Sequence, residues 1–294
     1  MLTGPEATVI GSEFFLSLYP ILIKLVRTTL PTQLLVRFGT FAAGAAAPAS
    51  AADLVAVAGS WAAIQRTLLV GLIAAVHTWA SYAAFASLST GVSMSLFYTY
   101  PLWNLVGAKV IYGESVGSSI PYLLSGILGT YLVSTKGLGD PIGGVTRAVA
   151  SPAAGVALAL LAALTESAMY FVVKDRASTT PWASMLELYG GAAVWLLAAA
   201  PLLGLSFAWN WSAIGLMTAF NVLVGFVGYA LRYYAVPLVS TEVFGLLSFV
   251  GVLSAFLFGF IFAGERPGMW SIVGAALIVW AVANVETIKK AVNK

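Results

Sequence analysis

The sequence predicts an all-α integral membrane protein whose ten transmembrane helices form two inverted five-helix repeats. Three observations support this prediction. The 294 residues are 60% hydrophobic and only 9% charged, with a mean hydropathy of +0.95, which is more apolar surface than a soluble domain of this length buries. Ten apolar stretches are long enough to cross a bilayer, and the second half of the chain repeats landmarks of the first half at a nearly constant spacing.

A bilayer core about 30 Å thick requires about 20 mostly apolar residues in a spanning helix. By this measure the chain contains ten candidate spans, near residues 6–26, 31–51, 67–88, 90–112, 118–135, 152–173, 182–204, 212–235, 239–262 and 268–286. We expect the first span to remain in the mature chain, because no basic region precedes it and a glutamate lies inside it.

Short stretches rich in helix breakers separate the candidate spans. TTLP at 28–31 separates the first two, STTP at 178–181 the sixth and seventh, and GERPG at 264–268 the last two. The longest connection, KGLGDPIGGVTRAVASP at 136–152, combines glycine, proline and charge. We therefore expect three parts in the chain, a first five-helix repeat at 1–136, a linker at 137–151 and a second five-helix repeat at 152–294.

The two halves share residues that are uncommon in apolar sequence. A shift of 151 places Ser89-Thr90 on Ser240-Thr241 and Gly113-Glu114 on Gly264-Glu265 without a gap. A shift of 150 aligns three more residues of the first half with identical ones in the second, namely Lys24, Thr29 and Pro31 with Lys174, Thr179 and Pro181. Because each repeat holds an odd number of helices, the second copy enters the membrane in the opposite orientation. Inverted repeats of this kind build transporters with a substrate site between the halves.

The stretch KLVRTTLPTQLLVRF, from Lys24 to Phe38, and fourth and ninth helices that each close on Gly-Glu accompany the five-plus-five repeat. Together these features resemble the EamA-like branch of the drug/metabolite transporter superfamily. Pro101 fits the family's proline in the fourth helix, whereas Val252, its counterpart in the ninth, departs from it. The resemblance implies a central cavity lined by helices 1 to 4 and 6 to 9, with helices 5 and 10 at the periphery, and it identifies no substrate.

The composition argues against several kinds of site and partner. Without cysteine there is no disulfide, thiolate nucleophile or thiolate-bound metal, and a single histidine, His77, does not suggest a metal site. No His-rich, Asp-rich or Gly-x-Ser-x-Gly arrangement is present, so we expect neither a cofactor nor enzymatic activity. The net charge is +3 and no basic patch suggests nucleic acid. The expected partners are a small-molecule substrate and the lipid bilayer, and the oligomeric state stays open.

The loops give a weak signal for orientation. With the N-terminus inside, seven basic residues fall on the inner side and five on the outer side, which favours cytoplasmic N- and C-termini. The family resemblance points the same way. A plasma or inner membrane is the favoured location, with an organelle membrane as the alternative.

The candidate substrate-binding residues are polar or aromatic side chains at membrane depth, where an ionisable group costs at least about 2.5 kcal/mol unless it is partnered or hydrated. The ionisable candidates are Glu13, Arg37, His77, Glu166, Glu187, Arg232 and Glu242. The aromatic and amide candidates are Trp79, Tyr82, Tyr98, Asn104, Tyr170, Asn221 and Tyr233. The alternative for each is a structural hydrogen bond, a helix-end position or a lipid-facing ring.

The depths of the charged candidates lead to two expectations. Glu13, Glu166, Glu187 and Glu242 all fall in the inner half of the membrane, with Arg232 as the only cation at comparable depth. Carboxylates clustered in a low dielectric do not all stay ionised, so a bound proton or an amine-bearing substrate should relieve the excess charge. Arg37 lies toward the outer end of its helix and Glu187 toward the inner end of its own, so we expect no ion pair between them.

The favoured function is therefore alternating-access transport of an amino acid or other amine-bearing solute, by proton coupling or by exchange. An exchanger of anionic metabolites, of the sugar-phosphate or nucleotide-sugar type, is the first alternative, because Arg37 and Arg232 could hold an anion. A channel or a receptor is the alternative from another functional class.

Overall fold

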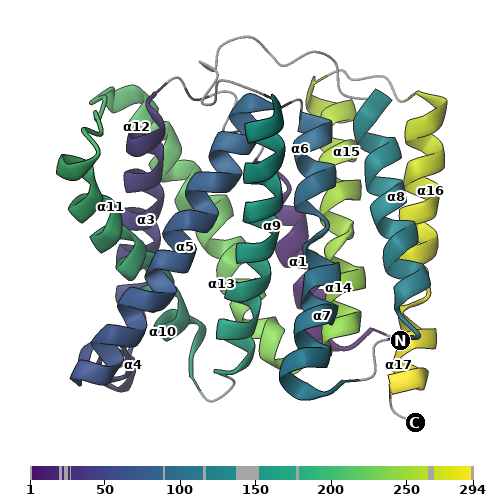
Figure 1. Ribbon diagram of the computed structural model, residues 1–294, viewed down its shortest axis with the longest axis horizontal. Helices are drawn as coiled ribbons and strands as arrows, with labels where there is room; N and C mark the ends of the chain where they lie inside the picture. The colour runs from purple at the N-terminus through teal and green to yellow at the C-terminus, as the bar shows by residue number, and fades with distance from the viewer. Residues whose placement is uncertain are drawn as a thin grey trace.

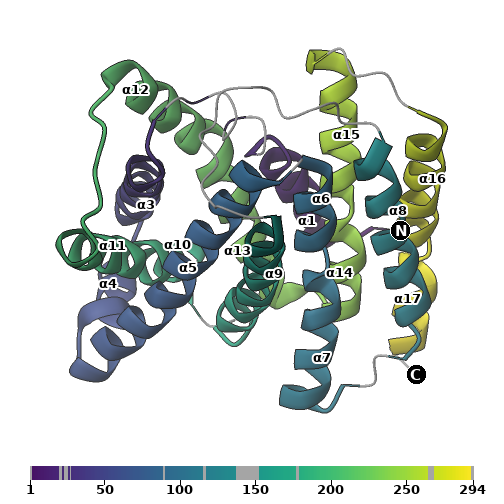
Figure 2. The same ribbon diagram turned by 45° about the horizontal axis from the view of Figure 1, so that its top comes forward.

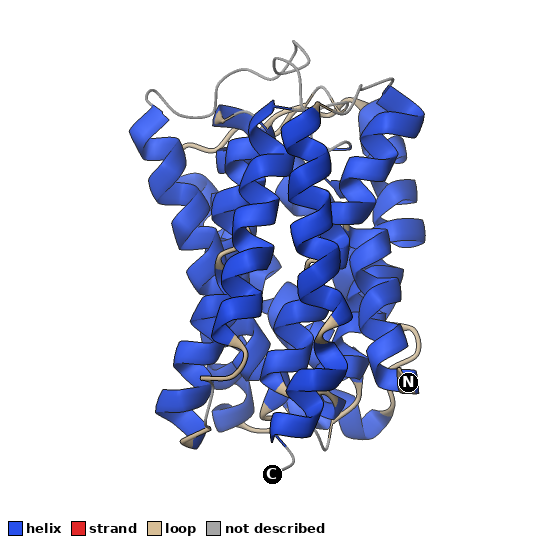
Figure 3. Ribbon diagram, turned by 90° about the vertical axis from the view of Figure 1, so that its right-hand side faces the viewer, coloured by secondary structure: helices blue, strands red, loops and turns tan. Residues whose placement is uncertain are grey.

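The computed structural model describes residues 2–19, 22, 26, 28–88, 90–114, 117–136, 152–176, 179–263 and 268–292. This part of the chain is helical and contains no strand (Figure 3). The expected linker at 137–151 lies outside the described residues, as do Lys24 and the Gly264-Glu265 end of the ninth span. The all-helical prediction is confirmed.

Six helices of the described residues are long and apolar enough to cross a membrane. They are Trp61–Ser87, Ala153–Lys174, Pro181–Leu202, Trp211–Leu238, Thr241–Phe258 and Met269–Lys290. Large apolar side chains also cover the outside of the bundle, among them Trp61, Leu202 and Met269, each at least 70% exposed. An exterior of this kind is typical of a chain that faces lipid rather than water.

The described residues of the first half form α1 (Gly4–Leu16), α3 (Leu30–Ala46), α4 (Ala51–Ala58), α5 (Trp61–Ser87), α6 (Thr90–Phe97), α7 (Tyr100–Tyr112) and α8 (Ile120–Lys136). Their ends follow local chemistry. Thr3 and Glu6 form a capping box at the start of α1, and prolines occupy the first turn of α1, α3 and α7, where a missing N–H is harmless. Gly113 ends α7 at φ 69°, a left-handed conformation that favours glycine.

The second half contains more interrupted helices. Its elements are α9 (Pro152–Lys174), α10 (Pro181–Met185), η1 (Leu186–Gly190), α11 (Gly191–Leu202), α12 (Trp211–Phe220), η2 (Asn221–Phe226), α13 (Val227–Ala235), η3 (Val236–Leu238), α14 (Thr241–Ser248), α15 (Val250–Ala263), α16 (Met269–Ala283) and α17 (Val285–Val292). The segments η1 and η2 are π-helical, and such turns within α-helices occur frequently at functional sites.

The helices pack as a bundle with α1 in its interior (Figures 1 and 2). α8 packs against α16 at one edge of the bundle, and α11 and α12 lie toward the opposite edge. Between these edges α1 contacts α13, and α5 contacts α9. This arrangement places one face of α1, α5, α9 and α13 toward the middle of the bundle, where the buried charges lie.

One helix crossing in the bundle is close enough to require glycine. A Cβ atom added to Gly71 of α5 would lie 2.4 Å from the Cα of Gly191 at the start of α11, whereas one added to Gly39 of α3 would have no heavy atom within 4 Å. Close approach through small residues is the usual way for helices to associate in a membrane.

We therefore expect Gly71→Ala to force α5 and α11 apart and to lower the free energy of unfolding by about 1–3 kcal/mol. Gly39→Ala is the matched control, because it adds the same methyl group in open space and should leave stability unchanged or raise it by up to about 1 kcal/mol. Denaturant unfolding of the two purified variants measures the difference. Equal effects of the two substitutions would contradict the close crossing.

Candidate functional site

Four buried charged or titratable side chains form a cluster at the centre of the bundle, the central charge cluster. Arg232 of α13 donates from Nη2 to Oε1 of Glu13 on α1 and from Nη1 to Oε1 of Glu166 on α9. His77 of α5 lies next, with its Nε2 3.2 Å from Oε2 of Glu166. All four side chains are buried, and four different helices contribute them. The sequence proposed each of these residues as a site residue, and the structure brings them together.

The contacts of His77 leave a position for one additional proton between its Nε2 atom and Glu166. Its Nδ1 lies 3.1 Å from the carbonyl oxygen of Ala162, so Nδ1 carries the N–H that this carbonyl accepts. A neutral imidazole then presents a lone pair at Nε2 to the carboxylate of Glu166, and neither atom can donate. A hydrogen bond between Nε2 and Oε2 of Glu166 requires one more proton, on the ring or on the carboxyl group.

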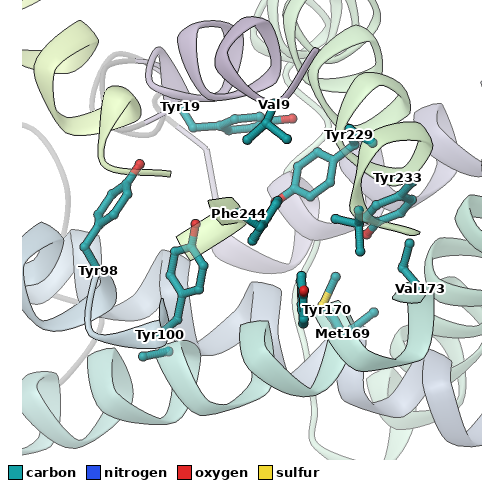
Figure 4. Packing of buried hydrophobic residues seen from close by; sticks show 14 of the residues in the cluster. Val9, Tyr19, Tyr98, Tyr100, Met169, Tyr170, Val173, Tyr229, Tyr233 and Phe244 are labelled. Carbon is teal, nitrogen blue, oxygen red and sulfur yellow. The ribbon is translucent and has the colours of Figure 1, made fainter. Parts of the chain in front are cut away.

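A cavity of about 60 Å³, with room for a few water molecules, lies beside the central charge cluster. Residues of α1, α3, α5, α6 and α13 and of the segments that follow α1 and α6 line it: Glu13, Leu16, Tyr19, Arg37, His77, Ser81, Tyr82, Phe85, Met94, Phe97, Tyr98, Tyr229 and Arg232. The ring centre of Tyr98, which lines the cavity, lies 5.8 Å from that of Tyr100. Figure 4 shows these two rings. The cavity thus has aromatic and apolar walls with a few charges, as is typical of sites for small organic molecules.

Arg37 lies in the same cavity and is surrounded by rings rather than carboxylates. Its Nη1 donates to the hydroxyl of Tyr82 at 3.3 Å. Its guanidinium carbon lies within 6 Å of five ring centres, those of Tyr19, Phe41, Tyr82, Tyr189 and Tyr229. Cation–π attraction offsets part of the cost of burying this charge.

A second ionic cluster surrounds Glu187 of η1. Its Oε1 accepts from Nη2 of Arg66 at 2.6 Å, and its Oε2 pairs with Arg176, which follows α9. The expectation that Glu187 does not pair with Arg37 is therefore confirmed. The expectation that Arg232 is the only cation near the four carboxylates is wrong, because Arg66 and Arg176 both reach Glu187.

Three polar contacts between the two halves lie at the end of the bundle that holds both termini. Thr180 donates to Asp53 at 2.7 Å, Tyr112 donates to Asp175, and Lys289 pairs with Glu6 at 3.0 Å. Burial opposes ionisation of Asp53, but hydrogen bonds from Thr180 and Ser50 hold the pKa of this carboxyl below its usual range. These contacts and the Glu187 cluster join the two halves at this end.

The other residues proposed from the sequence lie outside the cavity. Asn221 accepts from Tyr19 at 2.8 Å, and Tyr233 contacts Tyr189 at 3.3 Å, so both are one contact away from the surroundings of Arg37. Three more are buried elsewhere: Tyr170, which donates to Thr241 at 3.1 Å, Glu242, and Asn104, whose amide atoms have no hydrogen-bond partner among the described residues.

The proposal that Trp79 binds substrate is wrong. Its side chain is 45% exposed on the outside of α5, where lipid would contact it. The reason is helix geometry, because Trp79 follows His77 by two positions, or about 200° around an α-helix. His77 faces the centre of the bundle, so Trp79 faces away from it.

Seven cavity residues were not proposed as site residues from the sequence: Leu16, Tyr19, Ser81, Phe85, Met94, Phe97 and Tyr229. Tyr19 gave a usable signal, since it lies next to Pro20 in the middle of the first apolar stretch, where a proline interrupts regular helix. Leu16, Phe85, Met94 and Phe97 are ordinary apolar residues and gave none.

Comparison with known proteins shows the fold alone. No family model and no curated protein matches the chain. Solved structures do match, among them a crystal structure of a protein that is 17% identical and aligns with a TM-score of 0.73. The alignment covers 97% of this chain and 96% of that one. The bundle is therefore a fold that occurs in known structures, and at this identity the likeness says nothing of function.

Proposed function

We propose that the chain is a secondary transporter with ten transmembrane helices that moves a small organic metabolite by alternating access. Six spans follow from length and composition. We place the other four at α1 and the residues after it, at α3, at α6 with α7, and at α8, which lie in the remaining expected ranges. α3 and α8 have 17 residues each, about 26 Å of helix, and the fourth span is broken between α6 and α7.

The matching breaks in the fourth and ninth spans support the inverted repeat. α6 (Thr90–Phe97) and α14 (Thr241–Ser248) have the same length and are offset by 151 residues, and each gives way to a second helix within three residues. The packing supports it too. Exchanging the halves turns the contact of α1 with α13 into that of α9 with α5, and the contact of α1 with α15 into that of α9 with α7; all four contacts are present.

The inverted repeat makes a prediction about topology that single cysteines can test. Since the chain has no native cysteine, Ser115→Cys should react with an impermeant thiol reagent from the cytoplasmic side and Gly268→Cys from the outside. The two positions are equivalent connections in opposite orientations. Labelling of both from the same side would remove the inverted repeat and the transporter proposal with it.

We also propose membership of the EamA-like family, a plasma or inner membrane location and cytoplasmic termini. The ion pair between Glu6 and Lys289 supports placing both termini on one side of the membrane. The weak excess of basic residues on that side supports calling it the cytoplasmic side.

The observation that carries the functional proposal is the central charge cluster of Glu13, Arg232, Glu166 and His77, which lies beside a cavity between the two halves. Two carboxylates share one guanidinium there, so the central charge cluster keeps one negative charge that an ammonium group could neutralise. Glu13 is the carboxylate that lines the cavity. The favoured substrate is therefore an amino acid or another amine-bearing solute. The place for a proton between His77 and Glu166 supports coupling to protons.

The same observations give less support to the alternative functions. An exchanger of sugar phosphates or nucleotide sugars needs free cations for a dianion, yet Arg232 is engaged by two carboxylates. A channel would need a continuous polar path, and the cavity is small and has largely aromatic walls.

Exchange in proteoliposomes tests the proposal. The purified protein is loaded with unlabelled solute, and uptake of labelled amines, amino acids and phosphorylated sugars is measured with and without a pH gradient. We expect counterflow of amine-bearing solutes that responds to the gradient. Counterflow of phosphorylated sugars without amines would favour the anion exchanger, uptake without counterflow would favour a channel, and no uptake of any solute would favour a receptor.

A further inference from the structure

Arg37 is a buried cation that has no carboxylate partner among the described residues. Its side chain is 3% exposed, and no ion pair to it occurs among the described residues, whereas Arg66, Arg176 and Arg232 each pair with a glutamate. The Nε atom of Arg37 has no hydrogen-bond partner in this part of the chain. Five rings surround the guanidinium carbon at 4.5–5.8 Å, and rings attract a cation without neutralising it.

The position of Arg37 gives the cavity two poles of opposite sign. Glu13, Arg232 and Glu166 together carry one net negative charge when all are ionised, and Arg37 carries one positive charge. Both poles line the cavity, through Glu13 and Arg37. They are also near each other, because the ring of Tyr229 lies 5.0 Å from the guanidinium carbon of Arg37 and 5.8 Å from that of Arg232.

We propose that Arg37 binds the carboxylate of the transported solute, so that the site recognises a zwitterion rather than a simple amine. This inference rests on the proposed transport function and narrows its substrate class to solutes that carry both charges. A guanidinium fork matches a carboxylate with two parallel hydrogen bonds, and Arg37 has donors free for it. The ammonium group of the same solute would lie toward Glu13.

The same charges disfavour a phosphate at this position. A dianion would place a second negative charge beside Glu13, and Arg232, which also lines the cavity, is already engaged by two carboxylates. The walls favour an apolar remainder, since Leu16, Phe85, Met94 and Phe97 are apolar lining residues.

Pairs of solutes that differ only in the carboxylate test this inference. Proteoliposome exchange is measured for leucine and isopentylamine, valine and isobutylamine, and alanine and ethylamine, with wild type, Arg37→Gln, Arg37→Lys and the control Arg66→Gln. We expect wild type to prefer the amino acid of each pair. Arg37→Gln should lower amino-acid exchange by about 10- to 100-fold and leave amine exchange unchanged, with partial recovery in Arg37→Lys and little change in Arg66→Gln.

Two results would overturn the role of Arg37: amino-acid exchange by folded Arg37→Gln at the wild-type rate, or equal losses of the amino acid and the amine. If Arg37→Gln does not fold, competition on wild type decides, since isopentylamine competing as strongly as leucine rules out a carboxylate site. Amine exchange by wild type without amino-acid exchange refutes this inference and leaves the transport proposal standing. Exchange of neither class refutes the transport proposal itself.

Discussion

Arg232→Gln is expected to lower the free energy of unfolding by about 3–5 kcal/mol, the largest effect of any single substitution in the bundle. The reason is that one guanidinium serves two buried carboxylates, Glu13 and Glu166, at the place where four helices meet. Glutamine keeps an N–H donor but is shorter than arginine and carries no charge, so it leaves two carboxylates close together in a low dielectric. Thermal unfolding of the purified protein in detergent measures the loss.

The second ionic cluster supplies the matched control. Glu187 is served by two arginines, so Arg66→Gln leaves it paired with Arg176, and the Arg66 side chain is already 44% exposed. We expect Arg66→Gln to cost no more than about 1 kcal/mol. Arg232→Gln combined with Glu13→Gln and Glu166→Gln should recover most of the stability without recovering transport. Equal stability losses in Arg232→Gln and Arg66→Gln would contradict the central role of Arg232.

The sequence was a good guide to the position of helices along the chain and a poor guide to the direction of side chains around a helix. Hydropathy and breakers located the helices and showed that Glu13, Glu166 and Arg232 lie within apolar stretches. Counting residues from a helix end gives the position of a residue along the helix axis. It does not give the direction of its side chain around that axis. Trp79 was misplaced for this reason, although its two-residue spacing from His77 already argued that the two face opposite ways.

Pairing between charges depends on tertiary packing and on the reach of long side chains, and no local pattern encodes either. Arg66 and Arg176 lie outside the ten apolar stretches predicted from the sequence, yet both extend to the buried Glu187. Their reach gives Glu187 two cations that the sequence did not place beside it. The surroundings of Arg37 were equally hidden, because its five rings come from α3, α5, η1, α13 and the residues after α1.

Glu13→Gln is expected to lower exchange of amine-bearing solutes by about 100-fold while the protein stays folded. Glu13 is the carboxylate that both contacts Arg232 and lines the cavity, so its charge is the one an ammonium group of the solute can reach. Glutamine has the same shape and still offers an oxygen to Arg232, which keeps Glu166 as its ionic partner. A lost charge-assisted hydrogen bond of about 1.5–3 kcal/mol corresponds to this change in affinity.

Glu166→Gln separates solute binding from the general effect of neutralising a partner of Arg232. Glu166 pairs with the same guanidinium but does not line the cavity, and it faces His77 at 3.2 Å instead. Its replacement should leave the half-saturating concentration of solute within a few-fold of wild type and flatten the dependence of exchange on pH, since the place for a proton beside His77 is lost. Initial rates of exchange between pH 5 and pH 8 measure both effects. If the two glutamine variants raise the half-saturating concentration equally, Glu13 has no direct contact with the solute, and the charge it supplies acts only through Arg232.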